Sequence, residues 1–170
     1  MDWRFDGLTA LVSIAAGKAA DLGVLAGNRT GELISLKNQD RSLWNREQIA
    51  EGVALVEKAL QSRRFGPYTL QAAIAAVHAE AESTAVTDWR QIVSLYDQLV
   101  RIHPSPVVQL NRAVAIAMRD GPEAGLTHID ALLEQGELAN YYLAHSARAD
   151  MYRRLGRTSE AGPRTRKLWR

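Results

Sequence analysis

From residue 45 onward the hydrophobic positions recur at spacings of three and four, which is the period of an amphipathic helix. Between 88 and 103 they form one stripe: Trp89, Ile92, Val93, Tyr96, Leu99 and Val100. The segment at about 68–82 is apolar on nearly every side and rich in alanine, so we expect an inner helix that its neighbours approach closely. Almost no stretch alternates with the period of two that a strand requires. The pattern predicts an all-α fold.

Start and stop residues place the boundaries of these helices. Asn45, followed by Gln48, is typical of a capped helix N-terminus, and Gly66-Pro67 separates that helix from the next. Thr87 or Asp88 is the expected cap of the following helix, and Ser105 the cap of the one that Pro106 begins. Gly156 is an expected left-handed C-cap. The expected helices are about 45–63, 68–82, 88–103, 106–119, 122–135 and 138–155.

Two stretches of the chain resemble each other at an offset of roughly 35 residues. The run that contains Arg112-Ala113 recurs loosely around Arg148-Ala149, and a third, poorer copy ends in residues 89–100, before Pro104. Units of two helices repeating at about 34 residues are typical of tetratricopeptide arrays, in which each unit buries its apolar face by stacking. The repeat predicts a tetratricopeptide-like solenoid of antiparallel helix pairs. The residues expected to be buried between its helices are Ile92, Tyr96, Leu99, Ile116, Ile129 and Tyr152.

The first 44 residues follow a different pattern. A helix is possible over Leu8–Asp21, and residues 31–36 read as an extended arm, with glycines between the two. This stretch is too short to bury a core of its own. We therefore expect a partly irregular N-terminal segment, residues 1–44, packed on a helical domain formed by residues 45–170.

Composition narrows the class of protein. The chain is 46% hydrophobic and 24% charged, as a globular domain is, and has no cysteine. No apolar run approaches the ~20 residues of a membrane span, and acidic Asp2 and Asp6 precede the apolar run 8–16, where a secretory leader would be basic. We expect a cytoplasmic protein with no membrane association, monomeric or weakly dimeric.

The net charge of +2 is unevenly spread. Residues 148–170 hold eight basic and two acidic side chains, which leaves about −4 on the rest of the chain. A basic end can be a nucleic-acid footprint, but it is also what a solvated last helix has, since the helix dipole favours cations at a C-terminus. No aromatic stacking platform accompanies this charge, so we favour the second interpretation and expect no sequence-specific DNA binding.

Motifs for catalysis are missing from the sequence. The four histidines show no His-Glu-x-x-His spacing, and there is no Gly-x-Ser-x-Gly nucleophile motif and no glycine-rich phosphate loop. We expect no enzyme activity, no cofactor and no metal site.

The candidate functional residues are therefore polar side chains that could contact a partner protein: Asp40, Arg41, Gln71, His78, Asn111 and Arg112. Asp40-Arg41 could bind a partner or tie the N-terminal arm to the array, beside a core Trp44. Arg112 falls where the repeat expects an apolar residue. It either forms an internal ion pair or extends to water, or it faces a concave groove with Asn111 and receives an acidic or extended segment.

Most of the chain resembles one known family. The matching runs are NQDRSLWNREQIAEG (38–52), RRFGPYTLQAAIAAVHAEA (63–81), TDWRQIVSLYDQLVRIHPSPVVQLNRAVAIAM (87–118), DGPEAGLTHIDAL (120–132) and YYLAHSARADMYRRLGRTSEA (141–161). They resemble the C-terminal tetratricopeptide-like extension of a group of extracytoplasmic-function sigma factors, bacterial transcription initiation factors. The two promoter-binding sigma domains have no counterpart in this chain, and Gly162-Pro163 interrupts what the family leads us to expect as one continuous last helix.

The resemblance implies a regulatory domain that contacts the sigma core domains, RNA polymerase or a signalling protein. Two alternatives stay open. One is a free-standing helical-repeat adaptor outside transcription. The other is a small-molecule-binding helical domain, which would require His78, Trp89 and Asn111 to converge on one pocket.

Overall fold

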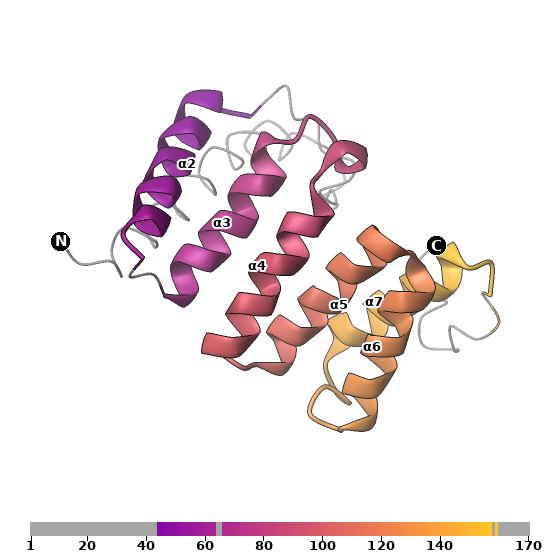
Figure 1. Cartoon of the computed structure of the whole chain (residues 1–170). Coiled ribbons are helices and arrows are strands. Elements are labelled where there is room, and N and C mark those ends of the chain that lie inside the picture. The colour runs from indigo at the N-terminus through magenta and orange to yellow at the C-terminus, as the bar shows by residue number, and fades with distance from the viewer. Residues whose placement is uncertain (1–43, 64–65, 158, 160–170) are drawn as a thin grey trace, which may run out of the picture. The chain divides into compact units, whose positions relative to one another are not determined.

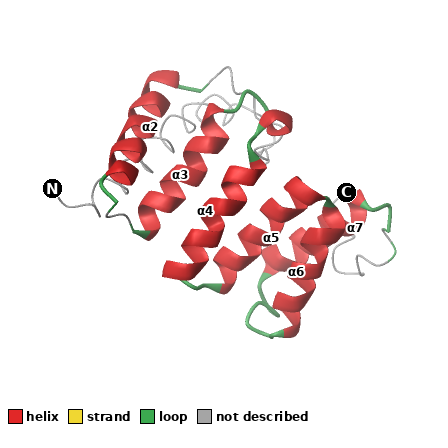
Figure 2. Ribbon diagram, viewed as in Figure 1, coloured by secondary structure: helices red, strands yellow, loops and turns green. Residues whose placement is uncertain are grey.

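The computed structural model describes residues 44–63, 66–157 and 159. All regular secondary structure in this part is helical, as Figures 1 and 2 show. Adjacent helices pack in pairs, so the all-α helical-repeat fold expected from the hydrophobic period is confirmed. The helices are α2 (Arg46–Gln61), α3 (Pro67–Glu80), α4 (Trp89–Ile102), α5 (Pro106–Asp120), α6 (Pro122–Glu134) and α7 (Tyr142–Arg154).

Several sequence predictions fall outside these residues. They are the helix over Leu8–Asp21, the extended arm at 31–36, the partner candidates Asp40 and Arg41, and the break at Gly162-Pro163. The chain divides into two compact units, and the boundary between them falls within α4, between Gln91 and Ile92.

The first unit contains α2 and α3, which pack against each other. Asn45 caps α2, since its side-chain Oδ1 accepts the Gln48 backbone N–H at 3.1 Å, so the predicted N-terminus is confirmed. The Arg46 guanidinium donates to the Ala79 carbonyl oxygen at 3.2 Å, which places the start of α2 beside the end of α3. The two helices are therefore antiparallel, as in a repeat unit.

Helix α3 is the buried inner helix that its composition predicts. Most of its positions are removed from solvent, namely Thr69, Leu70, Ala72, Ala73, Ile74, Ala76, Val77 and Ala79. Alanine at four of these positions lets neighbouring backbones approach closely. A 3₁₀ turn (Thr84–Val86) follows α3 and is held by Trp89, whose indole N–H donates to the Thr84 carbonyl oxygen.

In the second unit α5 packs on α6, and α6 packs on α7. The closest approach is at Gly125 of α6. A Cβ added there would lie 2.3 Å from the Ala117 Cβ and 2.9 Å from the Ala113 carbonyl oxygen, both on α5. A small residue is thus required where these two helices cross. Their core continues through Leu110, Leu126, Ile129, Leu132, Leu138, Ala144, Met151 and Tyr152.

The ends of α7 test two boundary predictions. Gly156 has a φ of +72°, and the Arg157 N–H bonds the Tyr152 carbonyl oxygen at 2.9 Å, so the predicted left-handed C-cap is confirmed. The predicted start near 138 is wrong, because α7 begins at Tyr142. Gly136, at a φ of +87°, reverses the chain, and a turn carries Leu138 into the core before the helix begins.

Among the residues expected to be buried, Ile92, Leu99, Ile116, Ile129 and Tyr152 are buried. Tyr96 is an exception: its side chain is only partly covered, although burial still raises the pKa of its phenol. A tyrosine has an apolar ring and a polar tip, so it can complete a hydrophobic stripe without leaving the surface.

Of the two other predicted helix caps, one forms a side-chain bond and one does not. Asp88 accepts the Gln91 N–H at 3.0 Å, whereas Ser105 makes no side-chain cap bond. None of the described helices has the length and apolarity that crossing a bilayer requires.

Candidate interaction surface

Two similar ion pairs join consecutive helices in the second unit. The Arg112 Nε of α5 donates to the Asp97 Oδ1 of α4 at 2.6 Å, and the Arg148 Nε of α7 donates to the Asp130 Oδ1 of α6 at 2.6 Å. In each case the arginine lies one helix after its aspartate. Arg112 and Arg148 occupy equivalent positions of the sequence repeat. The two copies of the repeat therefore share an ion pair as well as a sequence pattern.

The ion pair at Arg112 corresponds to one of the two alternatives drawn from the sequence. Its side chain is 32% exposed and that of Asp97 is 39% exposed, so the pair lies at the surface. The charge of Arg112 is therefore balanced within its own chain and needs no partner to explain it. Asn111, its neighbour, is exposed on α5 and stays a candidate contact.

The second ion pair borders a hollow of about 290 Å³ between α6 and α7. Asp130, Leu133 and Glu134 line it from α6, at the spacings of three and four that share one helix face. His145 and Arg148 line it from α7, three positions apart. We call this site the α6/α7 hollow. It combines one aliphatic side chain with two carboxylates, one imidazole and one guanidinium.

The cationic and aromatic groups of the hollow are fixed by local contacts. The Arg148 guanidinium lies over the Tyr152 ring at 5.2 Å and also donates to the Tyr152 hydroxyl at 3.3 Å. The His145 Nε2 donates to the Ala139 carbonyl oxygen at 2.7 Å, which sets the orientation of its ring at the rim. These contacts set the orientation of Arg148 and His145 at the hollow.

We expect the Asp130–Arg148 pair to contribute little to stability, because both side chains are more than a third exposed to screening solvent. A double-mutant cycle with Asp130→Ala and Arg148→Ala should give a coupling energy of about 0.2–1 kcal/mol in urea unfolding. The coupling should shrink as salt is raised. Arg148→Ala alone should cost more than the coupling, since it also removes the packing on Tyr152. A coupling above ~2 kcal/mol that persists in salt would contradict a solvent-screened pair.

A second hollow, also of about 290 Å³, lies in the first unit between α2 and the end of α3. It is lined by the aliphatic side chains of Ile49, Ala50, Val53, Ala54 and Ala79 and by the charged side chains of Arg46, Glu57 and Glu80. Arg46 is already engaged with the Ala79 carbonyl oxygen and lies over the Trp44 ring at 6.0 Å. The lining of this surface is therefore mostly aliphatic.

The remaining candidates from the sequence do not join either hollow. Gln71 and His78 are half-buried on α3. The His78 ring packs edge-to-face on Trp89, with centroids 5.1 Å apart. Asn111 belongs to the second unit, so the described contacts bring together only two of the three residues that a small-molecule pocket would require.

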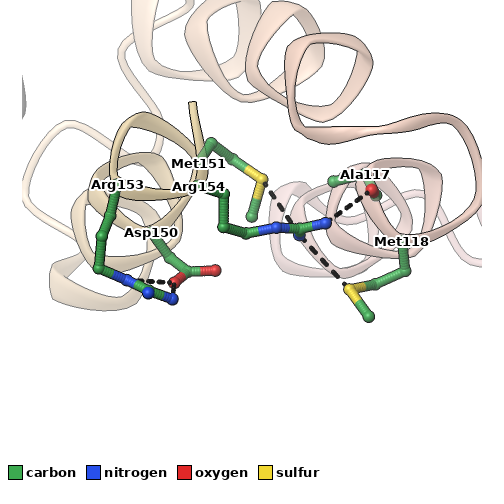
Figure 3. A network of polar contacts seen from close by, with 6 residues as sticks. All are labelled: Ala117, Met118, Asp150, Met151, Arg153 and Arg154. Carbon is green, nitrogen blue, oxygen red and sulfur yellow. Dashed lines mark hydrogen bonds and ion pairs between the residues drawn. The ribbon is translucent and has the colours of Figure 1, made fainter. Parts of the chain in front are cut away.

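The described cations at the basic end of the chain also have contacts within the chain. Figure 3 shows that Arg154 of α7 reaches the end of α5, where it donates to the Ala117 carbonyl oxygen at 3.3 Å and touches the Met118 sulfur at 3.4 Å. That carbonyl is one of the last four of α5, which have no partner inside their own helix. Arg153 pairs with Asp150. These contacts hold the α7 cations against the fold.

The chain is similar to one protein family and to one curated protein. Residues 3–60 match a family described as a family of unknown function (DUF6596). The matched region runs beyond residue 44 through nearly all of α2, while the boundary expected at 44/45 stays a prediction. The search of solved structures found no match.

A curated protein of Rhizobium meliloti (strain 1021), the Uncharacterized protein R00370, is 45% identical over 155 residues. The alignment covers 91% of this chain but 35% of that protein. The chain thus spans about a third of the length of the curated relative it matches.

Proposed function

We propose that this chain is a regulatory, protein-interaction domain of an extracytoplasmic-function sigma factor. The observation that carries the proposal is the nearly continuous resemblance over residues 38–161 to the helical extension of that family. Stacked helix pairs favour this role, since such arrays bind partners along their exposed faces. A curated relative about three times as long as the matched region is in keeping with a domain that is joined to others.

The chemistry of the described surface also favours protein contact over catalysis. Within residues 44–63, 66–157 and 159, no group of three or more histidine or acidic side chains is arranged to hold a metal ion. The α6/α7 hollow presents charged side chains next to an aliphatic one, as the polar rim of a protein interface does.

Binding to the transcription machinery is the direct test. The purified chain is mixed with bacterial core RNA polymerase, and separately with the promoter-binding domains of a sigma factor of the resembling group, and each mixture is run on a sizing column. We expect co-elution with at least one of them, and none with the domains of an unrelated sigma factor. No co-elution with either at micromolar concentration would overturn the proposal.

We further expect the chain to show no sequence-specific affinity for DNA, because Arg148 and Arg153 of α7 form surface ion pairs and are not part of a recognition helix framed by base-reading side chains. Any binding through the basic end should be equal for promoter and scrambled duplexes and should fall steeply with salt. The measurement is fluorescence anisotropy with both duplexes. A preference for the promoter that persists at ~200 mM salt would contradict this expectation.

The free-standing adaptor is the alternative function. It shares the same interaction chemistry but predicts no binding to polymerase or to sigma domains. The natural reading frame around this sequence separates the two: sigma domains encoded upstream in frame favour the first function, and their absence favours the adaptor.

A further inference from the structure

The α6/α7 hollow contains more hydrogen-bond acceptors than the fold uses. Arg148 engages Asp130 through one carboxylate oxygen, Oδ1. Within the described part of the chain, the other oxygen of Asp130 and both oxygens of Glu134 accept no hydrogen bond. Because Arg148 balances Asp130, Glu134 gives the site its excess negative charge. These acceptors are therefore available to a cationic hydrogen-bond donor.

Exposed aromatic surface lies on α7 one turn before the hollow. Tyr142, at the start of α7, is 57% exposed. Tyr142 precedes His145 by three positions, so it lies on the same face of α7 as the side chain that lines the hollow. Leu133 supplies an aliphatic wall from α6. A planar cation can stack on a tyrosine ring while its edge bonds a carboxylate.

The size of the hollow indicates what part of a ligand enters it. Its volume of about 290 Å³ is at the lower limit of small-molecule pockets, which enclose most of their ligand. This hollow opens to solvent between two exposed helix faces, and so fits a single long side chain that projects from a larger partner. Arginine suits the site better than lysine, because its guanidinium is flat and donates along two edges.

We infer that the α6/α7 hollow receives an arginine of a partner protein, with the guanidinium on Glu134 and the free oxygen of Asp130. An apolar residue next to that arginine packs on Tyr142. This inference rests on the proposed interaction role and specifies the chemistry of the partner segment.

The test is an NMR titration of the whole ¹⁵N-labelled chain with the peptide acetyl-Gly-Leu-Arg-Ala-Leu-Gly-amide. We expect shifts concentrated in residues 130–134 and 142–148. Replacing the peptide arginine with citrulline, which is neutral and nearly the same shape, should weaken binding about tenfold, the typical effect of losing a charge-assisted hydrogen bond. The Glu134→Gln variant should weaken binding by a similar factor.

Glu123→Gln is the matched control, since it removes the same charge from the same helix. Its site lies eleven residues earlier, about 16 Å along the axis at 1.5 Å per residue. It should leave the affinity unchanged. Equal affinity for the citrulline peptide, equal loss in Glu123→Gln, or the absence of shifts at the hollow would each overturn the inference.

The outcomes also separate this inference from the proposed function. If the chain co-elutes with polymerase or sigma domains equally well with Glu134 or Gln at that position and the peptide does not bind, the hollow is excluded and the sigma-factor role stands. If the peptide binds as expected and neither transcription partner does, the hollow stands and the adaptor function is supported.

Discussion

Replacing Gly125 with alanine is expected to destabilise the second unit, because overpacking a closely packed site costs about 1–3 kcal/mol. The new Cβ would lie 2.3 Å from the Ala117 Cβ and 2.9 Å from the Ala113 carbonyl oxygen. A backbone carbonyl cannot rotate away as a long side chain can, so α5 and α6 must move apart. Helix propensity acts in the opposite direction, since alanine is favoured over glycine by about 1 kcal/mol inside a helix. Urea unfolding followed by circular dichroism measures the net effect.

The double variant Gly125→Ala/Ala117→Gly tests the cause. It keeps one methyl group at the crossing but moves it from α5 to α6, and the helix-propensity terms nearly cancel. We expect it to recover part of the loss, because the contact with Ala117 is gone while the contact with the Ala113 carbonyl remains. A Gly125→Ala chain that is more stable than the wild type would mean that the two helices do not cross at Gly125.

The sequence predicted best what depends on local chemistry. The Asn45 cap and the left-handed Gly156 each need only a few consecutive residues, and both are confirmed. The prediction that α7 starts near 138 was wrong, because the turn at Gly136 is stabilised by Leu138, which is buried in the core. The burial of Leu138 depends on how other helices pack around it, so it produces no recognisable hydrophobic period in the local sequence.

The candidate surface shows the same limit. Arg148 was visible as the repeat equivalent of Arg112, and this equivalence is the one signal that pointed toward the α6/α7 hollow. The partner of Arg148 could not be predicted, since Asp130 lies on another helix and the pairing depends on how α6 and α7 cross. His145 gave no sequence signal, because its role at the rim comes from a bond to the Ala139 carbonyl in the preceding turn.

Shortening Ile129 to alanine should cost about 2–5 kcal/mol, the usual range for deleting a large aliphatic side chain from a core. Ile129 is 0% exposed and belongs to the core cluster that α5, α6 and α7 share. The loss combines the transfer free energy of the deleted methyl groups with the cavity they leave. Because the same helix is held at Gly125 by close contact with α5, it has little freedom to collapse into that cavity. The upper part of the range is therefore expected.

Two further variants separate burial from side-chain chemistry. Ile129→Val deletes one methylene and should cost about 0.5–1.5 kcal/mol. Leu143→Ala removes an aliphatic side chain of the same size from a site that is 51% exposed, and should change stability by less than ~0.5 kcal/mol. Each free energy comes from urea unfolding, with two transitions fitted if the two units unfold separately. Similar losses at Ile129 and Leu143 would place Ile129 at the surface and refute the packing of α6 between α5 and α7.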